Sequence, residues 1–186
     1  GEYFYLYLFM DIFSRKIVGY DIFDSESMDY SSQVFEQICI NEGISKDQLV
    51  LHSDNGGPMK GATMLATLQR LGVMPSFSRP RVSDDNPYSE SLFKTLKYKS
   101  DFPEVFREID DVKKWMLKFT NWYNEEHLHS GIKFVTPANR HAGEDKKVLE
   151  KRKKVYELAK QKFPERWNNR KTRNWDRDEK VYLNYL

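Results

Sequence analysis

The chain has 186 residues, of which 39% are hydrophobic, 31% are charged and 15% are aromatic. This length suits one domain with an extension or two very small domains, and the aromatic content argues against a disordered polymer. No apolar run approaches the roughly 18 residues that a membrane helix needs, and the single cysteine, Cys39, excludes an internal disulfide framework and a cysteine-rich zinc site.

Charge is distributed unevenly along the chain. Residues 146–186 carry 14 Lys and Arg against 6 Asp and Glu, a net charge of +8, whereas the other 145 residues carry 16 against 22, a net charge of −6. An acidic body suggests cation binding, and a basic tail suggests contact with a polyanion. The alternative for the tail is a solvated amphipathic helix, and charge alone favours that alternative.

Strand and helix patterns alternate through residues 5–99. Apolar runs bounded by turn residues indicate strands, and apolar residues on one helical face indicate helices. The predicted elements are a hairpin of strands 5–11 and 17–23, a helix 30–41, a strand 48–53, a helix 60–71, a strand 73–77, a polar loop 79–85, and a helix from Pro87 to about Lys99 capped by Asn86. This order predicts a layered α/β domain.

The rest of the chain is predominantly helical. Helices are predicted at 108–127, from Thr136-Pro137, and at 145–163, the last of them basic; from Pro164 on the chain is irregular until a predicted final strand at 181–186. We therefore divide the chain into a body of residues 1–143 and a helical basic arm and tail of residues 144–186. Trp115 and Trp122, seven residues apart on one helix, indicate a packing surface that would suit a dimer.

Two acidic residues stand out by their positions. Asp54 directly follows an apolar strand and precedes Asn-Gly-Gly, at the strand end where α/β folds place ligands. Glu90 lies in the helix that begins at Pro87, and Lys94 and Lys97 share its helical face. Taken singly, Asp54 is an ordinary turn residue and Glu90 a surface partner of Lys94.

Together the two acidic residues fit a known pattern, because 35 residues lie between Asp54 and Glu90 and a lysine follows Glu90 by seven. This resembles the second half of the D,D(35)E signature of retroviral integrases and of bacterial insertion-sequence transposases of the orfB type. Further segments resemble the same transposases in the same order, namely residues 7–20, 52–57, 91–97, 122–124 with His129, and 136–138, and the segments 164–167 and 172–175 resemble the tail of one subgroup.

The resemblance implies a ribonuclease H-like fold, with a mixed five-stranded sheet flanked by helices. It also implies that three carboxylates hold two divalent ions, Mg²⁺ or Mn²⁺, about 3.5–4 Å apart for DNA cleavage and strand transfer. Hard cations need oxygen ligands, which suits carboxylates. Carried over to this chain, Asp54 would bridge the two ions and Glu90 would bind one of them.

The same resemblance implies DNA as the partner, both transposon ends and target. Lys94 and Lys97 would lie on the helix that meets transposon-end DNA, and Arg79 and Arg81 of the polar loop are further expected DNA contacts. We expect a homodimer or higher oligomer, no membrane association, and a location in the bacterial cytoplasm with the nucleoid.

One part of the family pattern is missing from the sequence. The first catalytic Asp of the family lies on the strand before the hairpin, upstream of residue 1, and the chain starts without Met in what looks like a strand; we therefore expect an inactive fragment, which restoring that strand should reactivate. Asp11 is expected to pair with Arg15 rather than replace the missing ligand. The alternatives are a non-catalytic DNA-binding or interaction remnant acting through the basic arm, and a ribonuclease H-like nuclease, which would need a full set of carboxylates.

Overall fold

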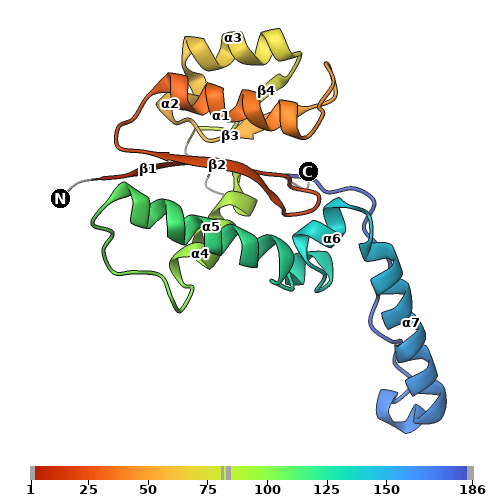
Figure 1. The fold of residues 1–186 in the computed structure, drawn as a ribbon. Helices are drawn as coiled ribbons and strands as arrows, with labels where there is room; N and C mark the ends of the chain where they lie inside the picture. The colour runs from red at the N-terminus through yellow and green to blue at the C-terminus, as the bar shows by residue number, and fades with distance from the viewer. Residues whose placement is uncertain (1–2, 81, 83–84, 184–186) are drawn as a thin grey trace. The chain divides into compact units, whose positions relative to one another are not determined.

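The computed structural model describes residues 3–80, 82 and 85–183 (Figure 1). It divides into two compact units. Unit 1 takes in the described residues of 1–11, 17–120 and 182–186, and unit 2 consists of residues 12–16 and 121–181. No helix in the described part of the chain is long and apolar enough to span a membrane.

Unit 1 begins with the predicted hairpin. Strand β1 (Tyr5–Met10) pairs antiparallel with β2 (Ile17–Phe23), and the register shifts at Phe9/Met10. Helix α1 (Met28–Asn41) packs on this hairpin so closely that a Cβ on Gly19 would lie 2.3 Å from Cγ1 of Ile38. A residue without a side chain is therefore required at position 19. The helix starts two residues earlier than predicted, because the Ser27 side chain caps it by accepting a hydrogen bond from the Asp29 N–H.

A parallel strand pair follows in the same unit. Strand β3 (Val50–Ser53) pairs with β4 (Met74–Phe77), and the crossover between them contains the short helix α2 (Gly57–Lys60) and helix α3 (Ala62–Leu71). The single helix predicted for 60–71 is wrong at its start, because Gly61 is extended and separates α2 from α3. A Cβ on Gly61 would lie 2.2 Å from the Met28 sulfur, so close packing decides this break.

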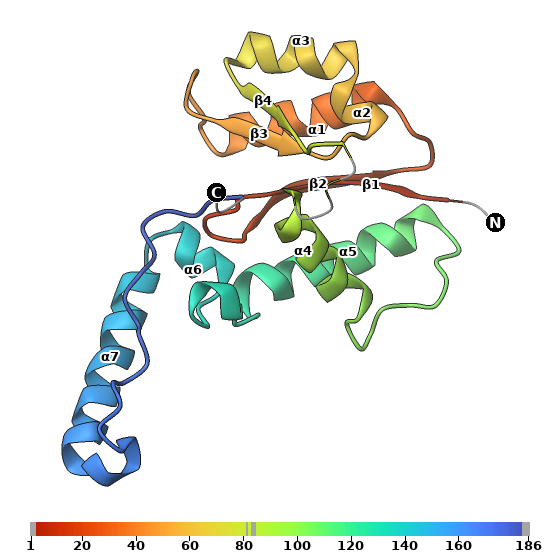
Figure 2. The ribbon, with the colours of Figure 1, turned by 180° about the vertical axis from the view of Figure 1, so that it is seen from behind.

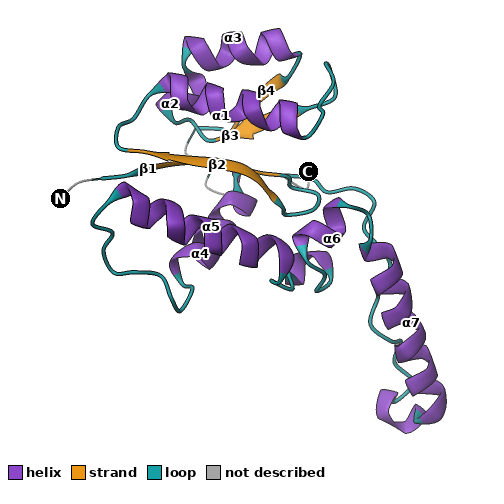
Figure 3. Cartoon of the chain, in the orientation of Figure 1, coloured by secondary structure: helices purple, strands orange, loops and turns teal. Residues whose placement is uncertain are grey.

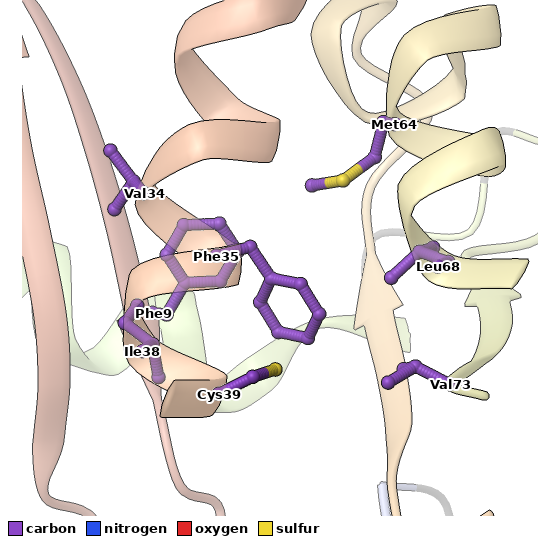
Figure 4. Packing of buried hydrophobic residues seen from close by; sticks show 8 residues of the cluster. All are labelled: Phe9, Val34, Phe35, Ile38, Cys39, Met64, Leu68 and Val73. Carbon is purple, nitrogen blue, oxygen red and sulfur yellow. The ribbon is translucent and has the colours of Figure 1, made fainter. Parts of the chain in front are cut away.

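One hydrophobic cluster joins the hairpin to the helices of unit 1. It draws on β1, α1, α3 and the residue that leads into β4, and Figure 4 shows these side chains pointing toward one another. Its buried members are Phe9, Val34, Phe35, Ile38, Cys39, Met64, Leu68 and Val73. Leu51 of β3 packs against the cluster, which ties the strand that carries Asp54 to the core.

Two long helices follow β4. Helix α4 (Pro87–Lys97) buries Leu92 and Leu96, and α5 (Ile109–Glu125) continues from unit 1 into unit 2 after Thr120. Trp115 is buried on α5, stacks on Phe119 and donates its indole N–H to the Asp101 carbonyl. The predicted packing role of Trp115 is therefore confirmed, and its contacts lie within the core of unit 1.

Unit 2 is mostly helical. It contains the 3-10 turn η2 (Ser130–Ile132), the short helix α6 (Pro137–His141), the basic helix α7 (Asp145–Lys162) and the 3-10 turn η3 (Pro164–Trp167). After η3 the chain returns along α7 without regular structure, as both views show (Figure 1 and Figure 2). Trp175 of this returning segment is buried with Ile132, Val135 and Leu149, so it pins the tail to the helices.

The mixed α/β class predicted from the sequence is confirmed (Figure 3). The described residues hold four strands, in one antiparallel and one parallel pair, rather than a sheet of five. The predicted last strand, 181–186, is wrong over residues 181–183, which form no strand. The Tyr182 carbonyl instead accepts a hydrogen bond from the Tyr88 hydroxyl. Residues 184–186 lie outside the described part.

Candidate active site

Asp54 occupies the turn that directly follows β3. Ser53, the last residue of the strand, is buried, whereas Asp54 is exposed. Its Oδ1 accepts a hydrogen bond of 3.0 Å from the Gly56 N–H, so the carboxylate closes its own turn. A Cβ at Gly56 would approach this Oδ1 to 3.0 Å, so glycine lets the turn close tightly around the carboxylate.

Glu90 lies in the first turn of α4, which begins with Pro87. The rotation of α4 is set by Leu92 and Leu96, which are buried, and Glu90, Lys94 and Lys97 are therefore exposed together. Asn86 occupies the N-cap position as predicted, but its side chain makes no capping hydrogen bond. The predicted side-chain cap is therefore wrong, and the Asn86 amide remains available to the space in front of the helix.

The structure brings Asp54 and Glu90 to one cavity of about 460 Å³. They are the two acidic side chains among its described lining residues, and polar residues complete most of the described wall. The other lining residues are Asn55, Ser78, Arg79, Val82, Asn86, Ser89 and Phe93. Lys94 and Lys97 are not part of this lining, and Arg81 lies outside the described residues. The cavity thus unites the two carboxylates singled out in the sequence with Arg79.

Hydrogen bonds between the ends of β3 and β4 hold the floor of the cavity. The Ser78 N–H donates to the Ser53 carbonyl, and the Asn55 side-chain amide donates to the Ser78 carbonyl at 2.9 Å. His52 lies between two serines, with its Nδ1 3.0 Å from the Ser76 Oγ and its Nε2 3.3 Å from the Ser78 Oγ. His52 therefore joins the two strands.

Arg79 is fixed at the wall of the cavity by Asp85. The guanidinium Nε and Nη2 donate to the two carboxylate oxygens at 3.0 and 2.8 Å, and the Arg79 N–H donates to the same carboxylate at 2.7 Å. The hydrogen bonds to Asp85 raise the pKa of Arg79. Because Asp85 is buried and committed to this bidentate pair, its carboxylate holds Arg79 in place.

Asp85, Ser78 and Ser89 were not singled out in the sequence. The only sequence signal for Asp85 was its place in the polar loop before α4, and nothing marked the two serines. Folding of the loop brings the Asp85 carboxylate back to the side chain of Arg79, six residues earlier in the sequence. The parallel pairing of β3 with β4 places Ser78 beside Ser53.

Asp54 and Glu90 differ in ion pairing from other acidic residues of unit 1. Neither forms an ion pair within the described part of the chain, whereas Glu36 pairs with Arg70 at 2.8 Å. Two carboxylates at one polar cavity suit a single Mg²⁺, which commonly takes one or two carboxylates and completes its shell with water and phosphate oxygens. The described residues contain no group of three His, Cys, Asp or Glu arranged for a metal ion.

Two family models, both described as the integrase core domain, match the chain over residues 1–83 and 71–137. Together they span the hairpin, both cavity carboxylates and all of α5. The chain belongs to the integrase core family. The likeness to insertion-sequence transposases and to retroviral integrase seen in the sequence is thereby confirmed.

Named relatives of this integrase core are transposases. The transposase for insertion sequence element IS904 of Lactococcus lactis is 30% identical over 134 residues, which cover 72% of this chain and 53% of that protein. The putative transposase InsK for IS150 of Escherichia coli is 25% identical, with 74% and 48% covered. A putative IS986/IS6110 transposase of Mycobacterium tuberculosis is 24% identical, with 74% and 51% covered. The chain spans about half the length of these relatives.

A solved structure shares the fold. It is a chain of the simian T-cell lymphotropic virus intasome in complex with the PP2A regulatory subunit B56 gamma. The TM-score is 0.55 at 17% sequence identity, and the match covers 73% of this integrase core chain and 47% of the viral one. This likeness in fold confirms the ribonuclease H-like class.

Proposed function

We propose that this integrase core serves DNA cleavage and strand transfer in transposition, as a metal-dependent polynucleotidyl transferase. The observation that carries the proposal is the shared cavity, in which Asp54 from the end of β3 and Glu90 from α4 are the acidic lining residues. Membership of the integrase core family supports the same reaction class. In this proposal Asp54 and Glu90 are the catalytic, metal-binding residues.

The roles of the side chains follow from their surroundings. Asp54 and Glu90 would hold Mg²⁺ or Mn²⁺, because their carboxylates are exposed and form no ion pair within the described residues. A bound ion supplies a more acidic attacking water or hydroxyl and charge stabilisation for the leaving oxygen. Arg79, held by Asp85, would orient a DNA phosphate at the cavity wall, and the exposed Lys94 and Lys97 would bind the backbone beside it. Arg81 remains an expected contact.

We further propose that residues 1–186 alone neither cleave nor join DNA. Among the described residues the cavity lining contains two carboxylates, whereas the family pattern uses three for its two ions. Transposon-end and target DNA are the proposed substrates, a homodimer or higher oligomer is the proposed assembly, and the bacterial nucleoid is the proposed location. A functional boundary at residues 143/144, between the catalytic body and the basic arm, is part of the same proposal.

Metal binding tests the proposal directly. Mn²⁺ titration of the 186-residue chain, followed by electron paramagnetic resonance, should reveal a site that Asp54→Asn and Glu90→Gln each weaken by more than about tenfold. The matched control is Glu26→Gln, since Glu26 is also exposed and lies far from the cavity in sequence. Equal Mn²⁺ affinity in Glu90→Gln and Glu26→Gln would refute the metal site.

The second candidate is a DNA-binding or interaction remnant without catalysis. The net charge of +8 over residues 146–186 favours it. Under this alternative no Mn²⁺ site depends on Asp54 or Glu90, while DNA binding weakens with salt and survives Glu90→Gln. A ribonuclease H-like nuclease would require further carboxylates at the cavity.

A further inference from the structure

Six of the eight cations of α7 form two sets with different surroundings. The first set faces the returning tail and its neighbours: Arg152 donates to the Lys133 and Phe134 carbonyls at 2.8 and 2.9 Å, Lys153 pairs with Asp176 at 2.8 Å, and Lys160 donates to the Arg170 carbonyl at 2.9 Å. Arg152 also lies over the Trp175 ring. These three side chains therefore contact other segments of unit 2.

The second set consists of Lys147, Lys151 and Lys154, which we call the lysine stripe. All three are exposed, and none forms an ion pair within the described part of the chain, although Glu150 and Glu157 lie on the same helix. Their spacing of four and three residues places them on one face with neighbouring Cβ atoms about 5–6 Å apart. The stripe spans about 10 Å of helix.

Glu150 and Glu157 lie within four residues of the stripe, but the three lysines form no ion pair with them within the described residues. Like charges at i, i+4 destabilise a helix, and Lys147 lies in the first turn, where the helix dipole disfavours a cation. The opposite face of α7 is already used, since Leu149 and Val148 pack with Ile132, Val135 and Trp175. The helix is therefore packed on one face and presents three lysines without ion pairs, within the described residues, on the other, which suits an anion-binding surface.

We propose that the lysine stripe binds the phosphate backbone of DNA, as an attachment site separate from the carboxylate cavity. The choice of DNA as the polyanion rests on the proposed function. Lysine ammonium groups bind phosphates as point charges and read no sequence, so the stripe would strengthen binding to any duplex. An anionic lipid surface fits less well, because Leu149 of α7 is buried inside unit 2 and, of the described residues of this helix, only Val155, Tyr156 and Leu158 are left as large exposed apolar residues, a small surface for insertion into lipid.

The test measures duplex binding by the 186-residue chain, using fluorescence anisotropy with a labelled 30-base-pair DNA in EDTA. Lys147→Gln/Lys151→Gln/Lys154→Gln should bind more than about tenfold more weakly at low salt, and its slope of log affinity against log salt should become shallower by about 2.7. The matched control, Lys113→Gln/Lys114→Gln/Lys118→Gln, removes the same charge from exposed positions of α5 and should keep the wild-type slope. The triple Arg variant of the stripe should also bind like wild type.

The outcomes separate this proposal from the catalytic one. Because the assay contains EDTA, the DNA affinity that it measures does not depend on a metal ion at the carboxylate cavity. Wild-type DNA affinity in the Gln stripe variant, equal losses in the α5 control, or no DNA binding by the wild-type chain would overturn the proposal. So would a stripe variant that loses binding to phosphatidylserine vesicles but not to DNA. Circular dichroism checks that both triple variants keep their helix content.

Discussion

The two cavity carboxylates of unit 1 and the buried carboxylate of Asp145 in unit 2 are used in opposite ways. In unit 1, Asp54 and Glu90 are exposed at a polar cavity and form no ion pair within the described residues. In unit 2, Asp145 is fully buried, with its Oδ2 2.7 Å from the Arg140 Nη1 and 3.4 Å from the Arg177 Nε. A buried carboxylate needs cations to offset its lost hydration, whereas an exposed unpaired one can give its charge to a ligand.

The buried cluster of unit 2 joins three separate segments of the chain. Arg140 of α6 donates to Asp145 at the start of α7 and to the Asp178 carbonyl of the tail at 2.7 Å. Arg140 and Arg177 both lie over the Phe13 ring. We interpret this cluster as structural, because each of its charges is taken up by another part of the same unit.

The largest expected effect comes from breaking this cluster. Asp145→Asn should lower the free energy of unfolding by about 3–5 kcal/mol, because it leaves the buried Arg140 guanidinium without a counter-charge. Urea denaturation followed by tryptophan fluorescence measures the change. The control is Asp176→Asn, which removes the exposed partner of Lys153. It should lower the free energy of unfolding by less than about 1 kcal/mol. Equal effects of the two substitutions would contradict the structural role of Asp145.

A smaller, pH-dependent effect is expected at His129. Burial, with the nearby Arg15 and His127, lowers the pKa of His129 to about 4 from its ordinary 6.5, and the neutral ring accepts the Gly131 N–H at Nδ1. As the pH falls, His129 of the unfolded chain gains a proton at a higher pH than His129 of the folded chain. The free energy of unfolding that is present above pH 6.5 therefore decreases as the pH falls toward 4. Discounted for the partial exposure of His129, the loss is roughly 1–2 kcal/mol.

Urea denaturation between pH 7.5 and pH 4.5 checks this dependence. His129→Asn keeps an acceptor for the Gly131 N–H and cannot gain a proton, so its stability should fall less steeply with pH. Burial also lowers the pKa of His127, so part of the dependence should remain in this variant. A variant as pH-sensitive as wild type would show that His129 is not the titrating group.

The smallest effect on stability is expected at the cavity. It would contrast with the large effect expected for the buried Asp145 of unit 2. Asp54→Asn and Glu90→Gln should each change the free energy of unfolding by less than about 0.5 kcal/mol in metal-free buffer, since both side chains are exposed and unpaired within the described chain. In the Asp54→Asn variant, the amide oxygen of the new side chain can still accept the Gly56 N–H. A decrease of more than about 1 kcal/mol in the free energy of unfolding of either variant would show that the carboxylate stabilises unit 1.

Much of the local structure was readable from the sequence because it depends on neighbouring residues. Period-two and period-3.6 apolar patterns predicted the hairpin, the strands β3 and β4 and the long helices within a few residues. The errors arose where distant contacts decide. Packing of Met28 against Gly61 separates α2 from α3, and the Tyr88 hydroxyl holds residue 182 where a strand was expected. Trp175 is buried by segments that lie more than twenty residues away.

By itself, the sequence determined the α/β class and the family likeness and proposed Asp54 and Glu90 as site residues, since residue types, periodicity and the Asp54–Glu90 spacing are properties of the chain. Only the tertiary structure decided that these carboxylates share a cavity, that Asp85 holds Arg79 at its wall, and which lysines of α7 are already paired. The physical reason is that ion pairing and burial depend on which distant segments meet, and only the folded chain brings them together.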